Sequence, residues 1–254
     1  MSPSLDQEKH MERHPIWLLA LSLYVFAQPG HAELQLDLSK KPKQVEATLR
    51  PLFESVVRPY GDRHSPDFGW PWGKNGTSTT YEGSNFLWTF NGVGLFSNVG
   101  SFTPEIAQLE DCKSDSDKLY RGHGCDWRRN RFNVCHLFLF NSKDLKLESV
   151  TRLDIVRDKK QLVGLPLCLN IQAMAIAKDI PDAMLITMSY IDSAERADPK
   201  YDPPEFYSTV LLRFSDESGK LKIEQDDSCL GNPNKYKTIA AARKALTNCA
   251  KVQK

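Results

Sequence analysis

The sequence lacks a marked excess of charge of either sign. Its 254 residues carry 33 lysines and arginines against 32 aspartates and glutamates, a formal net charge of +1. This balance supplies no global electrostatic field, which excludes a protein that coats nucleic acid or binds polyanions along its length. The sequence also lacks the ~18–20 consecutive apolar residues that a membrane-spanning helix needs. Because 41% of the residues are apolar and 15 are proline, we expect a soluble globular protein rather than a disordered, collagen-like or coiled-coil chain.

The motifs of common enzyme classes are missing as well. There is no Gly-x-Ser-x-Gly elbow, no glycine-rich phosphate loop and no alternation of basic and aromatic residues typical of nucleic acid binding. Beyond residue 32 the histidines are His64, His123 and His136. His136 lies in an apolar run beside Cys135, which favours a buried core histidine over a catalytic base. We expect no enzyme, no catalytic residue, no cofactor and no nucleic acid partner.

One pair of neighbouring residues leaves a catalytic alternative open. Cys125 follows His123 closely, and a cysteine thiolate activated by histidine is a nucleophile in some enzymes. The even number of cysteines favours a disulfide at Cys125 instead, because a free thiol there would leave five cysteines to pair.

The first 32 residues have the features of a signal peptide. An uncharged run, Ile16–Ala27, follows Arg13, and the small residues Gly30 and Ala32 fit the signal peptidase rule. We expect cleavage after Ala32 and a periplasmic or secreted protein; the alternative is a buried N-terminal helix. Residues 33–254 are then expected to form a single disulfide-stabilised, β-rich domain.

The cysteines predict how this domain is held together. All of them lie after residue 32, and an even number in an exported chain indicates a disulfide framework. A thiolate metal site is the alternative, but no Cys-x-x-Cys pair is present, so we expect no metal. Proximity along the chain favours the pairs Cys112–Cys125, Cys135–Cys168 and Cys229–Cys249.

Hydrophobic patterns predict a mostly β fold with a helix near each end of the domain. Alternating aromatic residues and an Asn91-Gly92 turn predict a hairpin between Tyr81 and Phe102. Helical spacing of apolar residues, with Ser39 as a candidate N-cap, predicts an N-terminal helix over Ser39–Val57. The remaining expected elements are hairpins at Phe132–Glu148 and Tyr207–Glu224, strands at Ile171–Ala177 and Ala183–Ile191, and a C-terminal helix at Thr238–Ala250.

Two of these hairpins resemble one another in sequence. His136–Phe140 aligns with Val210–Phe214, and each segment is followed by a turn and a second amphipathic strand. Two four-stranded antiparallel units at this spacing would form a sandwich or propeller-like hairpin units. Amphipathic hairpins also arise by chance, so the pattern leaves open whether the repeat is real.

The segment 111–131 is a candidate for partner recognition. Its first half is acidic, and its spacing of aspartates does not fit a calcium loop. The second half is basic, and a Cys112–Cys125 disulfide would hold the whole loop in one shape. A loop ordered in advance loses little entropy on binding. The alternative is a solvated charged loop that binds no partner. The basic residues expected to bind a partner are Arg121, Arg128, Arg129 and Arg131.

Two tryptophans form the other candidate. Trp70 and Trp72 lie among glycines and prolines, which predicts a loop. Tryptophans on a loop can anchor a protein interface, stack on sugar rings, or cover an open end of the core. By contrast, the strand aromatics Phe86, Trp88 and Phe90 are expected in the core.

Two functions fit these features. The first is an exported non-catalytic protein that binds another protein, for example an inhibitor or an immunity protein against a secreted toxin. Its contact residues would be the tryptophans and arginines named above. The alternative is a carbohydrate-binding module or glycosidase, suggested by Trp70, Trp72 and Tyr81. For a glycosidase, the candidate carboxylates are Asp62, Asp67 and Glu82, close to the aromatic residues in sequence.

Overall fold

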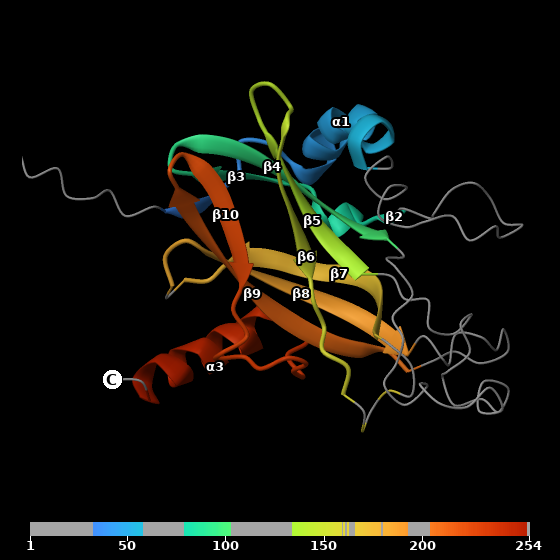
Figure 1. The fold of residues 1–254 in the computed structure, drawn as a ribbon, viewed down its shortest axis with the longest axis vertical. Helices are drawn as coiled ribbons and strands as arrows, with labels where there is room; N and C mark the ends of the chain where they lie inside the picture. The colour runs from blue at the N-terminus through green and yellow to red at the C-terminus, as the bar shows by residue number, and fades with distance from the viewer. Residues whose placement is uncertain are drawn as a thin grey trace, which may run out of the picture. The chain divides into compact units, whose positions relative to one another are not determined.

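The β-strands form two antiparallel sheets, which confirms the predicted fold class (Figure 1). The structure, a computed structural model, describes residues 33–57, 79–102, 134–158, 160, 162, 166–178, 180–192 and 204–252. Sheet A has the order β1-β3-β4-β5-β6, with β2 beside β4, and sheet B has the order β10-β9-β8-β7. No helix in these residues is long and apolar enough to cross a membrane.

The two sheets differ in their number of strands. Sheet A consists of β1 (Leu34–Asp37), β2 (Thr79–Thr80), β3 (Phe86–Phe90), β4 (Val93–Phe102), β5 (Val134–Asn141) and β6 (Leu147–Leu153). Sheet B consists of β7 (Pro166–Ile176), β8 (Ala183–Asp192), β9 (Phe206–Glu217) and β10 (Lys220–Gln225). The helical elements are α1 (Pro42–Leu52), the π-helix η1 (Phe53–Val57), the 3₁₀-helix η2 (Glu82–Ser84) and α3 (Ile239–Val252).

The main core lies between the two sheets. Alternate side chains of each strand point inward, so Trp88 and Leu137 of sheet A share one buried cluster with Met184, Ile186 and other residues of sheet B. This face-to-face packing makes the fold a β-sandwich rather than a propeller. Trp88 and Phe90 are buried there as predicted, at 0% and 4% exposure.

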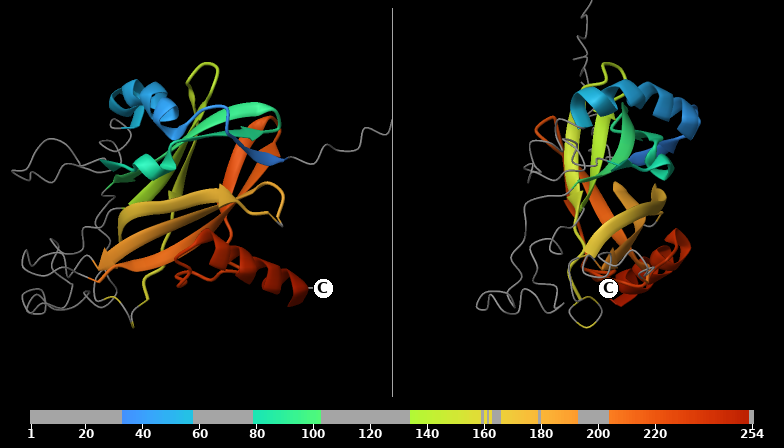
Figure 2. Two further views of the ribbon diagram at one scale, coloured as in Figure 1. Left: turned by 180° about the vertical axis from the view of Figure 1, so that it is seen from behind. Right: turned by 90° about the vertical axis from the view of Figure 1, so that its right-hand side faces the viewer.

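The outer face of each sheet is covered by a helix. On sheet A, Val45 and Leu49 of α1 pack against Phe96, Phe138 and Phe140. On sheet B, residues of α3 pack against β8 and β9. Figure 2 shows α1 and α3 on opposite sides of the two sheets. The predicted C-terminal helix is therefore confirmed as the cover of sheet B.

Local sequence signals explain where the helices begin. Thr238 accepts a hydrogen bond from the Ala241 N–H through its hydroxyl, which caps α3 at the position that the sequence predicts. Helix α1 begins at Pro42, and Lys41, rather than Ser39, is its N-cap. The Gln44 side chain accepts a hydrogen bond from the Lys41 N–H at 2.8 Å.

The hairpin connections match the predicted turns. Phe90 pairs with Val93 across Asn91 and Gly92, whose φ angles are 51° and 75°. Positive φ at both central residues is the requirement of a two-residue hairpin turn, and Asn-Gly is the pair that adopts it most readily. The β3–β4 hairpin is thus confirmed.

The proposed alignment of two hairpins is wrong in register. Sheets A and B do each contain a four-stranded meander, β3–β6 and β7–β10. However, the alignment equates Leu137, which points into the sandwich, with Leu211, which points outward under α3. It likewise equates outward Phe138 with inward Leu212. A duplicated unit would keep each face, because a shift of one residue reverses every side chain of a strand.

The free edge of β7 is covered by the segment before β3. The Tyr81 hydroxyl donates to the Cys168 carbonyl at 3.4 Å. A Cβ atom at Gly83 would lie 3.1 Å from the Ile171 carbonyl oxygen, a tight contact that a small residue avoids. Covering an edge strand in this way prevents it from pairing with another chain.

Side-chain amides connect the end of β6 to sheet B. The Gln225 amide accepts from the Asp154 N–H and donates to the Asp154 carbonyl, both at 2.9 Å. The Asn232 amide accepts from the Val156 N–H at 3.0 Å and donates to the Asp154 carbonyl at 2.8 Å. These two side chains replace the backbone partners that a neighbouring strand would supply.

Two predicted disulfides are present. Cys135–Cys168 joins β5 of sheet A to β7 of sheet B, and Cys229–Cys249 joins the segment after β10 to α3. The third predicted pair, Cys112–Cys125, lies outside the described residues. The two observed bonds are consistent with an oxidising extracellular or periplasmic location.

Replacing both Cys229 and Cys249 by alanine should destabilise the protein. The bond closes a loop with a sequence separation of 20, so its removal should lower the free energy of unfolding by about 3 kcal/mol. Urea denaturation of the oxidised proteins measures this difference. Under reducing conditions wild type and variant should become equally stable; a difference that persists there would assign the effect to packing.

Candidate functional site

All of the predicted contact residues, and several other predicted residues, lie outside the described part of the chain. These are Trp70, Trp72, Arg121, Arg128, Arg129 and Arg131, together with Cys112, Cys125, the candidate signal peptide 1–32, His64 and His123. The structure does describe the residues that flank them. These flanking residues show where the segments 58–78 and 103–133 join the sandwich.

The segment 103–133 joins the sandwich at one end, which we call the Cys135 end, and the segment 58–78 reaches the sheet beside it. The Cys135 end is formed by the paired strand ends Phe102 and Val134 in sheet A, and Pro166, Asp192 and Phe206 in sheet B. The segment 103–133 begins and ends there. Residue Thr79, which follows the segment 58–78, pairs with Ser101 beside the same end.

The Cys135 end is firmly connected across the two sheets. Val134 of β5 packs with Leu167 of β7 and Ile191 of β8 in a buried cluster. The disulfide between Cys135 and Cys168 links the same strands, with a Cα–Cα distance of 5.8 Å. This end therefore offers a rigid base for the segments attached at or beside it.

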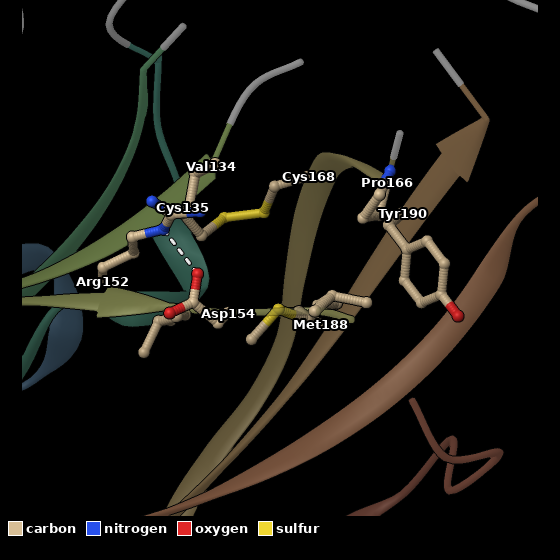
Figure 3. A pocket seen from close by; sticks show the side chains of 10 residues that line it. Val134, Cys135, Arg152, Asp154, Pro166, Cys168, Met188 and Tyr190 are labelled. Atoms are coloured by element: carbon tan, nitrogen blue, oxygen red, sulfur yellow. Dashed lines mark ion pairs between the residues drawn. A yellow bond between two sulfur atoms is a disulfide. The ribbon is translucent and has the colours of Figure 1, made fainter. Parts of the chain in front are cut away.

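A small pocket lies between the sheets next to this disulfide (Figure 3). It is bordered by the disulfide, by the ion pair between Arg152 and Asp154, and by Met188 and Tyr190. Its volume of about 30 Å³ has room for a water molecule but not for an organic ligand. In Figure 3 the Tyr190 hydroxyl points away from the disulfide. Burial, with a smaller contribution from the charge of Asp158, raises the pKa of Tyr190 to about 12.

A larger pocket lies under α1 on the outer face of sheet A, and we call it the α1 pocket. Its volume is about 160 Å³. Apolar side chains from the helical segment and the sheet form about half of its wall, and polar or charged side chains form the other half. The residues that line it are Glu46, Leu49, Arg50, Phe53, Val57, Asn85, Asn98 and Phe140.

The shape of the helical segment accounts for the position of this pocket. Pro51 lies inside α1 and supplies no backbone N–H, and the chain continues as the π-helix η1 after Leu52. The Ser55 hydroxyl donates to the Pro51 carbonyl at 3.0 Å. Leu49 lines the pocket before this change of helical pitch, and Phe53 and Val57 line it afterwards.

Two buried asparagines form the polar part of the wall. Along β4, Phe96 points outward and Val99 points inward. Because side chains alternate along a strand, Asn98 lies on the same outer face as Phe96, the face covered by α1. Its amide nitrogen donates to the Asn85 side-chain oxygen at 2.8 Å. Asn98 is 5% exposed and Asn85 is 2% exposed. The Asn98 side-chain oxygen accepts no hydrogen bond, which is rare for a buried polar atom.

The mouth of the pocket carries an ion pair. Arg50 and Glu46 are one helical turn apart on α1, and their side chains approach to 3.1 Å. They are 77% and 34% exposed, so the pair is screened by solvent and contributes little to stability. The pocket thus has a charged but electrically balanced rim and a neutral amide in its interior.

The remaining sequence predictions can be compared with the described residues. His136 is a core histidine as predicted, 8% exposed and with its Nδ1 3.1 Å from the Val134 carbonyl oxygen. Tyr81 is buried at 8% exposure, so it cannot stack on a sugar with the two tryptophans as the carbohydrate alternative requires. No group of histidine, cysteine or acidic side chains within the described ranges has the geometry of a metal site.

The sequence reasoning missed Asn85 and Asn98. A signal for Asn98 was present, because asparagine is disfavoured in strands and here lies within an apolar segment.

Comparison of the chain with models of known protein families, with curated proteins and with solved structures finds no match. Any functional conclusion therefore rests on the geometry of the Cys135 end and the α1 pocket.

Replacing Asn85 by alanine should destabilise the fold through Asn98. The Asn98 amide nitrogen would lose its acceptor while remaining buried, which costs about 1–3 kcal/mol. In an Asn98→Leu background the same change should cost at least about 1 kcal/mol less, because no donor is left unpaired. A double-mutant cycle in urea measures the coupling. Additive costs would mean that the two amides do not depend on each other.

Replacing Tyr190 by phenylalanine should remove a loss of stability at high pH. The folded state holds the phenolic proton more tightly than the unfolded chain, since the pKa rises from 10.0 to about 12. The stabilisation is therefore complete below pH 10.0 and is lost as the pH rises towards 12. Across this range wild type should lose about 2 kcal/mol more than the variant in urea denaturation. Equal losses would assign the titration to other groups.

Proposed function

We propose that this chain is an exported, non-catalytic protein whose function is to bind another protein. An inhibitor, or an immunity protein against a secreted toxin, would work in this way. The contact residues in this proposal are Trp70, Trp72, Arg121, Arg128, Arg129 and Arg131. The observation that carries the proposal is the Cys135 end, at or beside which the segments containing these residues are attached.

The Cys135 end supports binding because it is held rigid. A disulfide joins β5 to β7 there, and Val134 packs against Leu167 of β7 and Ile191 of β8. Rigid attachment limits the conformational entropy that a binding surface loses when its partner docks. Tryptophan and arginine are the residue types most often found to dominate binding energies at protein interfaces.

The chemistry of the disulfides supports the proposed export. Bonds such as Cys135–Cys168 and Cys229–Cys249 persist in oxidising compartments and are rare in reducing ones. In this proposal residues 1–32 direct the chain across a membrane, and residues 33–254 act in the periplasm or outside the cell. The glycan alternative has less support, because Tyr81 is part of the core.

Reversing two charges should weaken binding without unfolding the protein. The partner is first isolated with immobilised residues 33–254, disulfides formed, from envelope and secreted fractions of the source. The Arg128→Glu and Arg129→Glu double variant should then bind it about tenfold more weakly, because the interface arginines are replaced by repelling charges. Surface plasmon resonance measures the affinity, and urea denaturation confirms an unchanged stability.

A matched control separates this surface from a general charge effect. Lys143 in the β5–β6 turn and Lys220 at the start of β10 are both exposed, at the opposite end of the sandwich from the Cys135 end. Changing both to glutamate alters the net charge equally and should leave the affinity intact. Equal weakening by both double variants would contradict the proposed surface. If no protein is retained specifically, the binding proposal is wrong and glycans become the ligands to screen.

A further inference from the structure

We infer that the α1 pocket receives a single tyrosine side chain of the protein partner. This inference rests on the proposed function, since it takes the ligand to be a protein. It assigns a second contact site, on described residues, in addition to the surface at the Cys135 end. Three properties of the pocket lead to tyrosine: its size, the apolar part of its wall, and the unpaired oxygen of Asn98.

The size of the pocket fits one aromatic ring. Its volume is about 160 Å³, and an engineered protein cavity of about 150 Å³ holds one molecule of benzene. Pockets for drug-sized or cofactor ligands are larger, about 300–1,000 Å³. A single side chain inserted from a partner is therefore a better match than a whole cofactor.

The apolar wall favours a ring over a flexible or charged chain. Leu49, Phe53 and Phe140 surround the space, and aromatic rings gain additional energy from packing against one another. A lysine or arginine would bring an uncompensated charge into the pocket, because the carboxylate of Glu46 is already paired with Arg50. The incoming group should thus be aromatic and neutral.

The Asn98 oxygen distinguishes tyrosine from phenylalanine. It is buried in the wall and has no hydrogen-bond donor, although the amide nitrogen of the same side chain is paired with Asn85. A phenolic hydroxyl is a donor at the far end of a ring, so it can pair with this oxygen while the ring stays in the apolar space. Because the oxygen has almost no accessible surface in the unbound protein, the side chains beside it have to move aside when the ring enters. Phenylalanine would leave the oxygen unpaired, and an indole ring is larger than the space requires.

Two buried hydroxyls on the outer face of sheet B are paired with each other. Thr187 and Thr209 are both fully buried there, and their hydroxyl oxygens are 2.8 Å apart. The Thr209 hydroxyl also donates to the Tyr236 carbonyl at 2.8 Å. The threonine hydroxyls under α3 are therefore paired, whereas Arg243 Nε of α3 and the Asn98 oxygen beside the α1 pocket are buried without a partner. Of these two atoms, only the Asn98 oxygen is an acceptor with which a phenol can pair.

The test compares ligands that differ only in the hydroxyl. Binding of p-cresol and of toluene to the intact protein is measured by chemical-shift changes in nitrogen–proton NMR spectra. We expect p-cresol to bind about three- to tenfold more tightly than toluene, the effect of one hydrogen bond to a neutral acceptor. The shifted signals should belong to residues that line the pocket, such as Leu49 and Val57.

A matched pair of variants identifies the acceptor. Asn98→Leu keeps the approximate size of the side chain and removes its oxygen, so the preference for p-cresol over toluene should fall to about one. Asn170→Leu makes the same change at an exposed position of β7 in sheet B and should preserve the preference. If Asn98→Leu does not fold, the comparison of the two ligands on wild type still decides whether the hydroxyl contributes.

The last experiment tests whether the pocket can bind a tyrosine ring that is attached to a peptide backbone. N-acetyltyrosinamide carries the peptide groups that would have to lie at the mouth beside Glu46 and Arg50, and it should bind more tightly than N-acetylphenylalaninamide. Binding of p-cresol with exclusion of N-acetyltyrosinamide would overturn the assignment to a protein side chain. No binding of either cresol or toluene, or equal binding of both, would overturn the pocket as a site for phenols.

These outcomes are independent of the proposed function. The ligand titrations need no partner, so they can fail even where a partner binds at the Cys135 end. Conversely, the arginine variants can leave partner affinity unchanged while the pocket binds N-acetyltyrosinamide. In that case the proposed surface is wrong and the pocket assignment stands.

Discussion

The structure depends on two strands that are buried on both faces. Every residue of β8, and all of β5 except its last, is buried. The inward side chains of these strands form the core of the sandwich, but their outward side chains are equally apolar and need a cover of their own. Helices α1 and α3 are consequently required by the central strands, and the fold is a layered arrangement of helix, sheet, sheet and helix.

The two outer layers meet this requirement to different extents. On sheet B, α3 is fixed by the disulfide to Cys229, and the segment after β10 pairs the buried threonines. On sheet A, the helix changes to a π-helix after Pro51, and a space remains between it and β4. The α1 pocket is thus a place where the cover of a doubly buried sheet is incomplete, and an unpaired polar atom lies there.

Part of this fold could be predicted from local sequence signals. The Asn91-Gly92 turn, the hairpin β9–β10 and the C-terminal helix depend on neighbouring residues, and each was predicted. The disulfides Cys135–Cys168 and Cys229–Cys249 were predicted from the even number of cysteines and from their proximity along the chain. The turn, the hairpin and the helix could be predicted because the physical cause of each lies within a few neighbouring residues.

The orientation of the strands could not be predicted in the same way. When one face of a strand is exposed to solvent, alternation of apolar and polar residues shows which face is buried. Strands buried on both faces are apolar throughout, so this signal is missing. Leu137 and Phe138 therefore look alike in sequence, although they point in opposite directions. The alignment with Leu211 and Leu212 matched residue types and reversed the faces. Tyr81 was misjudged for a similar reason, because its burial depends on the distant strand β7.

The α1 pocket and the Cys135 end are close enough to contact one partner. Asn98 and Ser101 lie on the same strand, β4, three residues apart, which corresponds to about 10 Å. A typical protein interface covers about 800 Å² on each partner, so it would span both places. The two would then act differently, because exposed charges mainly accelerate the encounter, whereas a side chain buried in a pocket mainly slows dissociation. A binder with both could combine rapid capture of its partner with a long-lived complex.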